Sequence, residues 1–102
     1  MNKDWYKETL NSIIQAYKED KLEEWLATIP LDIYVTHRLN SKDLESAEIV
    51  LTVGRARIYI DTGDSSIHCS DIHHLATYAI PADVNNKISE IIQEWIDESI
   101  AS

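Results

Sequence analysis

The sequence has few of the residues that interrupt or cross-link a chain. Its 102 residues include two glycines, two prolines, one cysteine and no phenylalanine. A single cysteine cannot form a disulfide within the chain, which fits a reducing compartment. So few glycines and prolines argue against long loops. Gly54 and Gly63 are the only glycines, so a glycine-rich loop that cradles phosphate groups is excluded.

Long apolar runs are also missing. No run approaches the ~18 residues that a membrane-spanning helix needs, and the N-terminal stretch MNKDWYKE is polar, unlike a signal peptide. We therefore expect a cytoplasmic protein without membrane contact.

Basic residues are scarce in the second half of the chain. The net charge is −9, and residues 58–102 hold eight acidic residues against one base, Lys87. Such a field repels phosphate backbones, so we expect no direct binding to nucleic acid. It attracts basic protein surfaces. The alternative interpretation is that the acidity only keeps a small protein soluble.

Helical periodicity appears at both ends. Apolar residues recur at helical spacing at Tyr6, Leu10, Ile13, Ile14 and Tyr17. Asp20 and Glu23 have the spacing of a capping box that starts a second short helix, which ends at Pro30. Near the C-terminus, a helix that starts at Pro81-Ala82-Asp83 has an apolar stripe and an acidic back; the stripe comprises Val84, Ile88, Ile91, Ile92 and Trp95.

Alternation with period two predicts strands between the helices. The first covers 31–40, with Ile33, Val35, His37 and Leu39 on one side. A turn at 41–46 precedes a strand whose buried residues include Ile49 and Leu51. Gly54-Arg55 is a hairpin turn before the strand that ends at Asp61, and Asp61–Asp64 is a further turn. Residues 66–69 and 75–80 form the last strands.

This order of elements predicts one α+β domain over residues 1–102. We expect an antiparallel sheet of four or five strands, because the links are short and no β-α-β crossover is visible. One or two N-terminal helices and the C-terminal amphipathic helix should pack on one face of that sheet.

The densest group of metal-ligand types contains His68, Cys69, Asp71, His73 and His74. Zinc prefers such ligands. However, neighbouring residues of a strand point to opposite sides, so few of them can converge. We expect no cofactor, and a zinc-stabilised domain that uses His68, Cys69, His73 and His74 remains an alternative.

Catalytic chemistry has little support. Cys69 follows His68, but adjacency in sequence is not the geometry of a Cys–His pair. The serines near them lack the glycines of a nucleophile elbow. The carboxylates of Asp97 and Glu98 lie on a solvated helix face. We therefore predict a protein that is not an enzyme and has no catalytic residues.

Two surfaces are candidates for partner binding. The first is acidic, and its members are Glu90, Glu94, Asp97, Glu98, Asp61, Asp64 and Asp71. The second is the exposed strand face, where Tyr34 and Tyr59 accompany arginines, residue types that are enriched in interfaces. The same residues also serve as ordinary cross-strand partners.

The segments Ile49–Ile60 (IVLTVGRARIYI) and Ala76–Val84 (ATYAIPADV), followed by the terminal helix, cover half of the chain. Together with the small size and the acidity, they resemble small phage- or prophage-encoded proteins of the anti-CRISPR type. The resemblance implies an inhibitor that binds a host nucleic-acid-handling or defence complex in the host cytoplasm. The partner would be a larger protein or complex with a basic surface. The alternative is a homo-oligomeric structural or regulatory domain, such as a homodimer.

Overall fold

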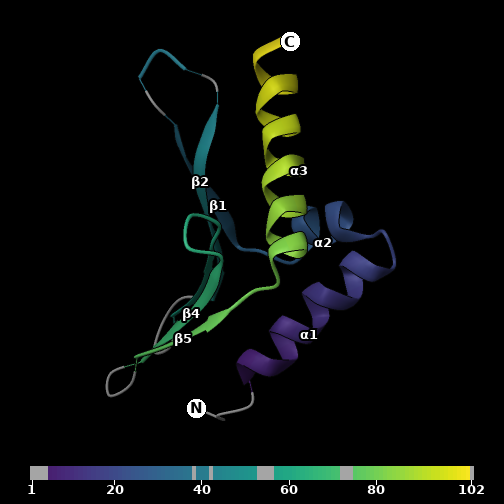
Figure 1. Cartoon of the computed structure of the whole chain (residues 1–102), viewed down its shortest axis with the longest axis vertical. Coiled ribbons are helices and arrows are strands. Elements are labelled where there is room, and N and C mark those ends of the chain that lie inside the picture. The colour runs from purple at the N-terminus through teal and green to yellow at the C-terminus, as the bar shows by residue number, and fades with distance from the viewer. Residues whose placement is uncertain (1–4, 38, 42, 53–56, 72–74, 102) are drawn as a thin grey trace.

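The residues that the structure describes form eight helices and strands, in the order that the sequence predicts (Figure 1). The computed structural model describes residues 5–37, 39–41, 43–52, 57–71 and 75–101. The helices and strands are α1 (Trp5–Lys18), α2 (Leu22–Thr28), β1 (Asp32–His37), β2 (Leu44–Thr52), β3 (Arg57–Asp61), β4 (Ser66–Ser70), β5 (Leu75–Ala79) and α3 (Ala82–Ala101).

The five strands form one sheet in the order β1-β2-β3-β4-β5, and every neighbouring pair is antiparallel. Each strand therefore pairs with the strands that precede and follow it in the sequence, as the short links predict. The register places isoleucines opposite one another, because Ile49 pairs with Ile60 and Ile60 pairs with Ile67. This row crosses the centre of the sheet.

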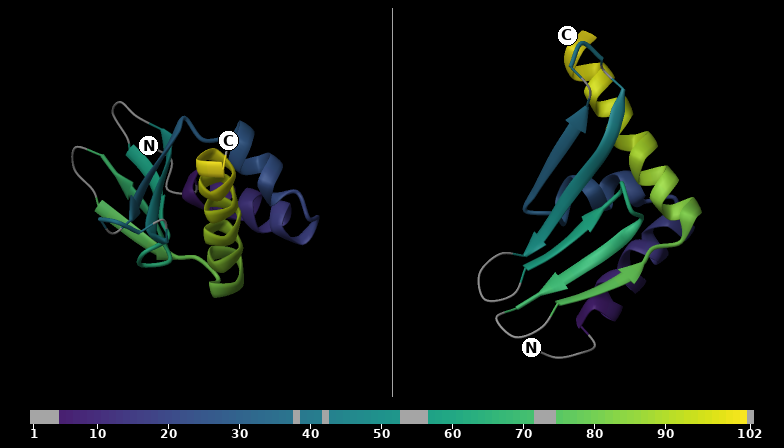
Figure 2. Two further views of the ribbon diagram at one scale, coloured as in Figure 1. Left: turned by 90° about the horizontal axis from the view of Figure 1, so that it is seen from above. Right: turned by 60° about the vertical axis from the view of Figure 1, so that its left-hand side comes forward.

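All three helices lie on the same side of the sheet (Figure 2). The isoleucine row faces them, and the apolar residues of α3 pack against it: Val84, Ile88, Ile91 and Ile92 are buried. Ile13 of α1 is also fully buried, while Trp95 is partly buried at the edge of this core. The predicted α+β fold, with the C-terminal helix packed on an antiparallel sheet, is confirmed.

The predicted capping box at the start of α2 is wrong. Lys21 is the N-cap residue of α2, and no side chain caps it. Asp20 instead ends α1 in the left-handed conformation, with φ 58°. The amide of Lys21 donates to the Ala16 carbonyl at 2.8 Å, and the amide of Asp20 donates to the Tyr17 carbonyl at 3.2 Å. These are the two hydrogen bonds of a Schellman motif, so the chain breaks here rather than kinks.

Two strand boundaries also differ from the prediction. β2 begins at Leu44, inside the segment predicted as a turn, because Leu44 pairs with His37 of β1. The Leu44 amide also donates to Oε1 of Gln93 on α3 at 2.7 Å. β1 ends at His37, so Leu39 lies in the following loop and is 91% exposed. Arg38 and the predicted Gly54-Arg55 turn lie outside the described residues. None of the helices in the described ranges is long and apolar enough to cross a membrane.

Thr62, in the turn between β3 and β4, forms hydrogen bonds with both β2 and α3. Its hydroxyl accepts a hydrogen bond from the Ala47 amide at 2.8 Å, and its own amide donates to the Ala47 carbonyl at 3.0 Å. Its carbonyl accepts a hydrogen bond from Nδ2 of Asn85, near the start of α3, at 3.1 Å. Both Thr62 and Asn85 are buried. One polar residue thus ties β2 and α3 to the same turn.

We expect Thr62→Val to destabilise the protein by about 1–3 kcal/mol, because it leaves the buried Ala47 amide without its acceptor. Urea unfolding followed by circular dichroism measures this change. The matched control is Thr36→Val on exposed β1, which should stay within about 0.5 kcal/mol of the unmodified protein. Equal stability of the two variants would show that the Thr62 hydrogen bond contributes nothing.

Candidate functional site

The side of the sheet that faces away from the helices, here called the outer face, carries polar and aromatic side chains. The alternation of buried and exposed residues along the strands places them there. β2, β3, β4 and β5 contribute Glu48, Arg57, Tyr59, Asp61, His68 and Thr77, and β1 contributes Tyr34.

These side chains contact one another across four strands. Arg57 forms an ion pair with Glu48, and its guanidinium carbon lies 4.7 Å from the centre of the Tyr59 ring. Tyr59 stacks on His68, with ring centres 4.8 Å apart and planes inclined by 11°. The register explains this contact, because Tyr59 and His68 are direct partners in the β3–β4 pair. The stack fixes the imidazole plane.

His68 has partners for both ring nitrogens. Its Nε2 lies 2.8 Å from Oδ2 of Asp64, and its Nδ1 lies 3.1 Å from the Thr77 hydroxyl oxygen. A hydroxyl both donates and accepts, so Thr77 can satisfy Nδ1 whether or not that nitrogen carries a proton. His68 therefore keeps its hydrogen bonds in either protonation state, which suits a structural role on this face.

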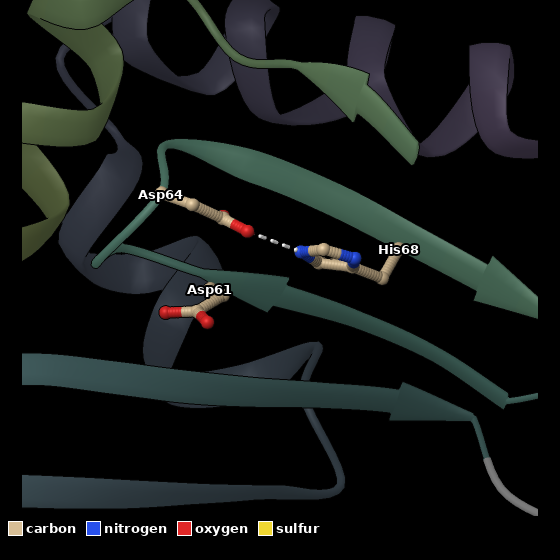
Figure 3. A group of neighbouring side chains, drawn as sticks. All are labelled: Asp61, Asp64 and His68. Atoms are coloured by element: carbon tan, nitrogen blue, oxygen red, sulfur yellow. Dashed lines mark hydrogen bonds and ion pairs between the residues drawn. The ribbon is translucent and has the colours of Figure 1, made fainter. Parts of the chain in front are cut away.

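Asp61 lies beside this pair, and Figure 3 shows the three side chains together. One donor atom from each of Asp61, Asp64 and His68 lies within 4.8 Å of the other two. Ligands of one zinc ion, at ~2.1 Å from the metal, lie about 3.4 Å apart. Asp61 also accepts a hydrogen bond from the Gly63 amide at 2.8 Å. The arrangement is that of a hydrogen-bonded carboxylate–imidazole pair with a second carboxylate nearby.

The structure places two of the suggested zinc ligands, His68 and Cys69, on opposite faces of β4. His68 lies on the outer face, whereas Cys69 is buried in the core on the opposite face of β4. These two residues cannot bind one ion. Asp71 follows β4 and is half-buried, while His73 and His74 lie outside the described residues.

The Cys69 thiol is held in its neutral form. Burial raises its pKa above the ordinary value, because the charged thiolate loses its hydration inside the core. Since thiolate is the reactive form, this position disfavours a nucleophilic role.

We expect iodoacetamide to alkylate Cys69 roughly tenfold or more slowly in the folded protein than in urea at pH 8. Mass spectrometry reads this rate directly, because the chain has one cysteine. The raised pKa also means that the thiol's contribution to stability is complete below about pH 8.5 and decreases as the pH rises through the folded-state pKa. Equal alkylation rates in the folded and unfolded chains would contradict this placement.

Tyr34, a predicted contact residue, is 57% exposed on β1. Its pKa is raised, first by the hydrogen bond that its hydroxyl makes with Asp32 and then by the charge of that carboxylate. Both effects favour the neutral phenol. Tyr34 therefore offers an exposed ring and a neutral hydroxyl to a partner.

The acidic residues of α3 form a separate surface. We call Glu90, Glu94, Asp97 and Glu98 the acidic stripe; all four are exposed, on the side of α3 that faces away from its buried residues. Nζ of Lys87 lies 3.7 Å from Oε1 of Glu90, and Oδ1 of Asp97 accepts a hydrogen bond from Nε2 of Gln93 at 3.1 Å. The acidic residues that were predicted as one surface thus lie on two, because Asp61 and Asp64 belong to the outer face of the sheet.

Sequence reasoning missed Glu48 and Thr77 as members of the outer-face group. Only the register of the strand pairs identifies them, because it places Glu48 opposite Asp61 and Thr77 opposite His68. Period-two alternation places a residue on a face but does not identify its partners on other strands.

A scan of family models, a search of curated proteins and a search of solved structures each found no match to this chain.

Proposed function

We propose that this chain is a non-enzymatic protein-binding module that inhibits a nucleic-acid-handling or defence complex, in the manner of anti-CRISPR proteins. Its acidic stripe on α3 engages a basic surface of that complex in a cell's cytoplasm. The observation that carries the proposal is the exposure of all four carboxylates on one side of a single helix.

The spacing of the carboxylates supports contact with a basic protein surface. Glu90, Glu94 and Glu98 recur every four residues, which is about 6 Å along a helix axis. Phosphates of one DNA strand recur every ~3.4 Å along the duplex axis. The three glutamates therefore offer roughly half of that linear charge density. Carboxylates at this spacing can pair with arginines and lysines that would otherwise hold a phosphate backbone.

The acidic stripe is also held on a rigid support. The opposite side of α3 is anchored in the core by Ile88, Ile91 and Ile92, and Gln93 fixes the helix to the start of β2. A partner that binds these carboxylates does not have to order the backbone that bears them. Less conformational entropy is lost on binding, which favours affinity.

The burial of the Cys69 thiol and the contacts of the His68 ring support a non-enzymatic role. Cys69 is buried with a raised pKa, and His68 is engaged by Asp64, Thr77 and the Tyr59 ring. Neither group is positioned as a nucleophile with a free base beside it.

The proposal predicts that Glu94→Lys with Glu98→Lys will raise the protein concentration needed for half-inhibition by about tenfold or more. These two carboxylates are chosen because Glu90 lies near Lys87 and Asp97 is bound to Gln93. The assay measures cleavage of a DNA target by purified, guide-loaded CRISPR nuclease complexes of several types. The matched control is Glu8→Lys with Glu19→Lys on and after α1, which changes the net charge equally.

Inhibition by the unmodified protein should weaken with rising salt, and the control variant should inhibit like the unmodified protein. Equal loss of inhibition in both variants would show that only net charge matters. No inhibition of any complex by the unmodified protein would remove the proposal. Thermal unfolding of both variants establishes that they are folded.

A further inference from the structure

β1 is an exposed edge of the sheet. It pairs with β2 on one side, and the described part of the chain provides no strand on its other side. Six large hydrophobic residues in the described ranges are exposed, and five of them lie in β1 or close to it. These five are Ile29, Leu31, Tyr34, Val35 and Leu39; the sixth, Leu75, lies on β5 at the opposite edge.

An apolar groove runs between this strand and the C-terminal half of α3. Ile33 and Val35 form one wall, and Ile92, Trp95, Ile96 and Ser99 form the other. The groove has a volume of about 290 Å³. Figure 2 shows α3 continuing alongside β1 and β2 beyond the shorter strands β3, β4 and β5. The groove thus lies between the edge strand β1 and the part of α3 that extends furthest along it.

β1 lacks the usual protection of an edge strand. Natural edges commonly carry lysine, proline or an inward-pointing charge that blocks pairing with another chain. The six residues of β1 include neither lysine nor proline. Its one carboxylate, Asp32, accepts hydrogen bonds from the Ile33 amide and the Tyr34 hydroxyl and lies on the outer face with Tyr34, so it is not an inward-pointing charge. The register irregularity between Thr36 and His37 lies at the far end of the strand.

We propose that the edge of β1 accepts an extended segment of a partner protein as a sixth strand. The segment alternates apolar and basic residues. Its apolar side chains enter the groove against Val35 and Trp95, and its basic side chains lie on the outer face near Asp32. Main-chain hydrogen bonds to β1 supply affinity, and the groove supplies specificity for the alternating side chains.

Charge decides between a basic partner and a second copy of this chain. Two carboxylates lie close to residues of this edge: Asp32 precedes Ile33 at the start of β1, and Oε1 of Glu23 accepts a hydrogen bond from Nε1 of Trp95 at 3.3 Å. A second copy would bring another net charge of −9 to this edge, which opposes association. The sign of the partner's charge rests on the proposed function; the strand addition rests on β1 and the groove alone.

The test uses a fluorescent seven-residue peptide that alternates lysine and valine, with a glutamate–valine peptide as its charge control. Fluorescence polarisation measures binding to the full chain. We expect the lysine peptide to bind at least tenfold more tightly than the glutamate peptide. Hydrogen exchange of β1 amides should slow when the lysine peptide is bound, because β1 then pairs on both sides.

Val35→Glu should raise the dissociation constant of the lysine peptide by tenfold or more, even though it adds an attractive charge, because it fills the groove with a carboxylate. The matched variant Leu75→Glu, on the other edge strand, should change it less than twofold. Thermal unfolding of both variants establishes that they are folded.

Equal weakening by Val35→Glu and Leu75→Glu, equal binding of the two peptides, or no binding of either peptide would overturn the inference. So would a dimer in light scattering that Val35→Glu dissociates while the peptide does not bind. Peptide binding without inhibition of any nuclease complex would count against the proposed function alone. Inhibition of a nuclease complex by the unmodified protein, with no binding of either peptide to it, would overturn this inference alone.

Discussion

The contact between the inner face of the sheet and the apolar sides of the helices is the constraint on which the rest of the molecule depends. Isoleucine dominates this contact, and its fully buried members are Ile13, Ile49, Ile58, Ile60, Ile67, Ile88 and Ile92. A chain of 102 residues has enough apolar side chains for one such layer. All three helices therefore cover one face of the sheet. The polar and aromatic side chains of the opposite face must find their partners among one another.

Because the helices cover only one face of the sheet, the uncovered surfaces differ in their chemistry. On the outer face, Arg57, Tyr59 and His68 satisfy one another across the strands instead of being buried. On the helix side, α3 is long enough to reach past the short strands and to leave Ile92 and Trp95 facing β1. The acidic residues of α3 lie on the one side that neither contact uses. Three surfaces with different chemistry thus follow from a single buried layer.

The sequence was sufficient for features that depend on local periodicity. The stripe of Val84, Ile88 and Ile92 predicted α3, and the alternation of Ile33, Val35 and His37 predicted β1. It was insufficient where a contact between distant segments sets the boundary. β2 starts early, at Leu44, where that residue pairs with His37 of β1 and its amide donates to Gln93, 49 residues away. The groove beside β1 likewise depends on how far α3 extends over the sheet. The local periodicity of the sequence does not predict that distance.

The sequential strand order has a consequence for how the chain reaches its folded state. Each strand pairs with its neighbour in the sequence, so the whole sheet can assemble from hairpins without closing a long loop. Proteins dominated by such local pairings fold faster than sheets with distant pairings. Thr62 connects this hairpin assembly to the docking of α3, because its turn closes between β3 and β4 and then receives Asn85. The sheet and its covering helix can therefore form outward from one turn near the middle of the chain, while α1 and α2 join a surface that already exists.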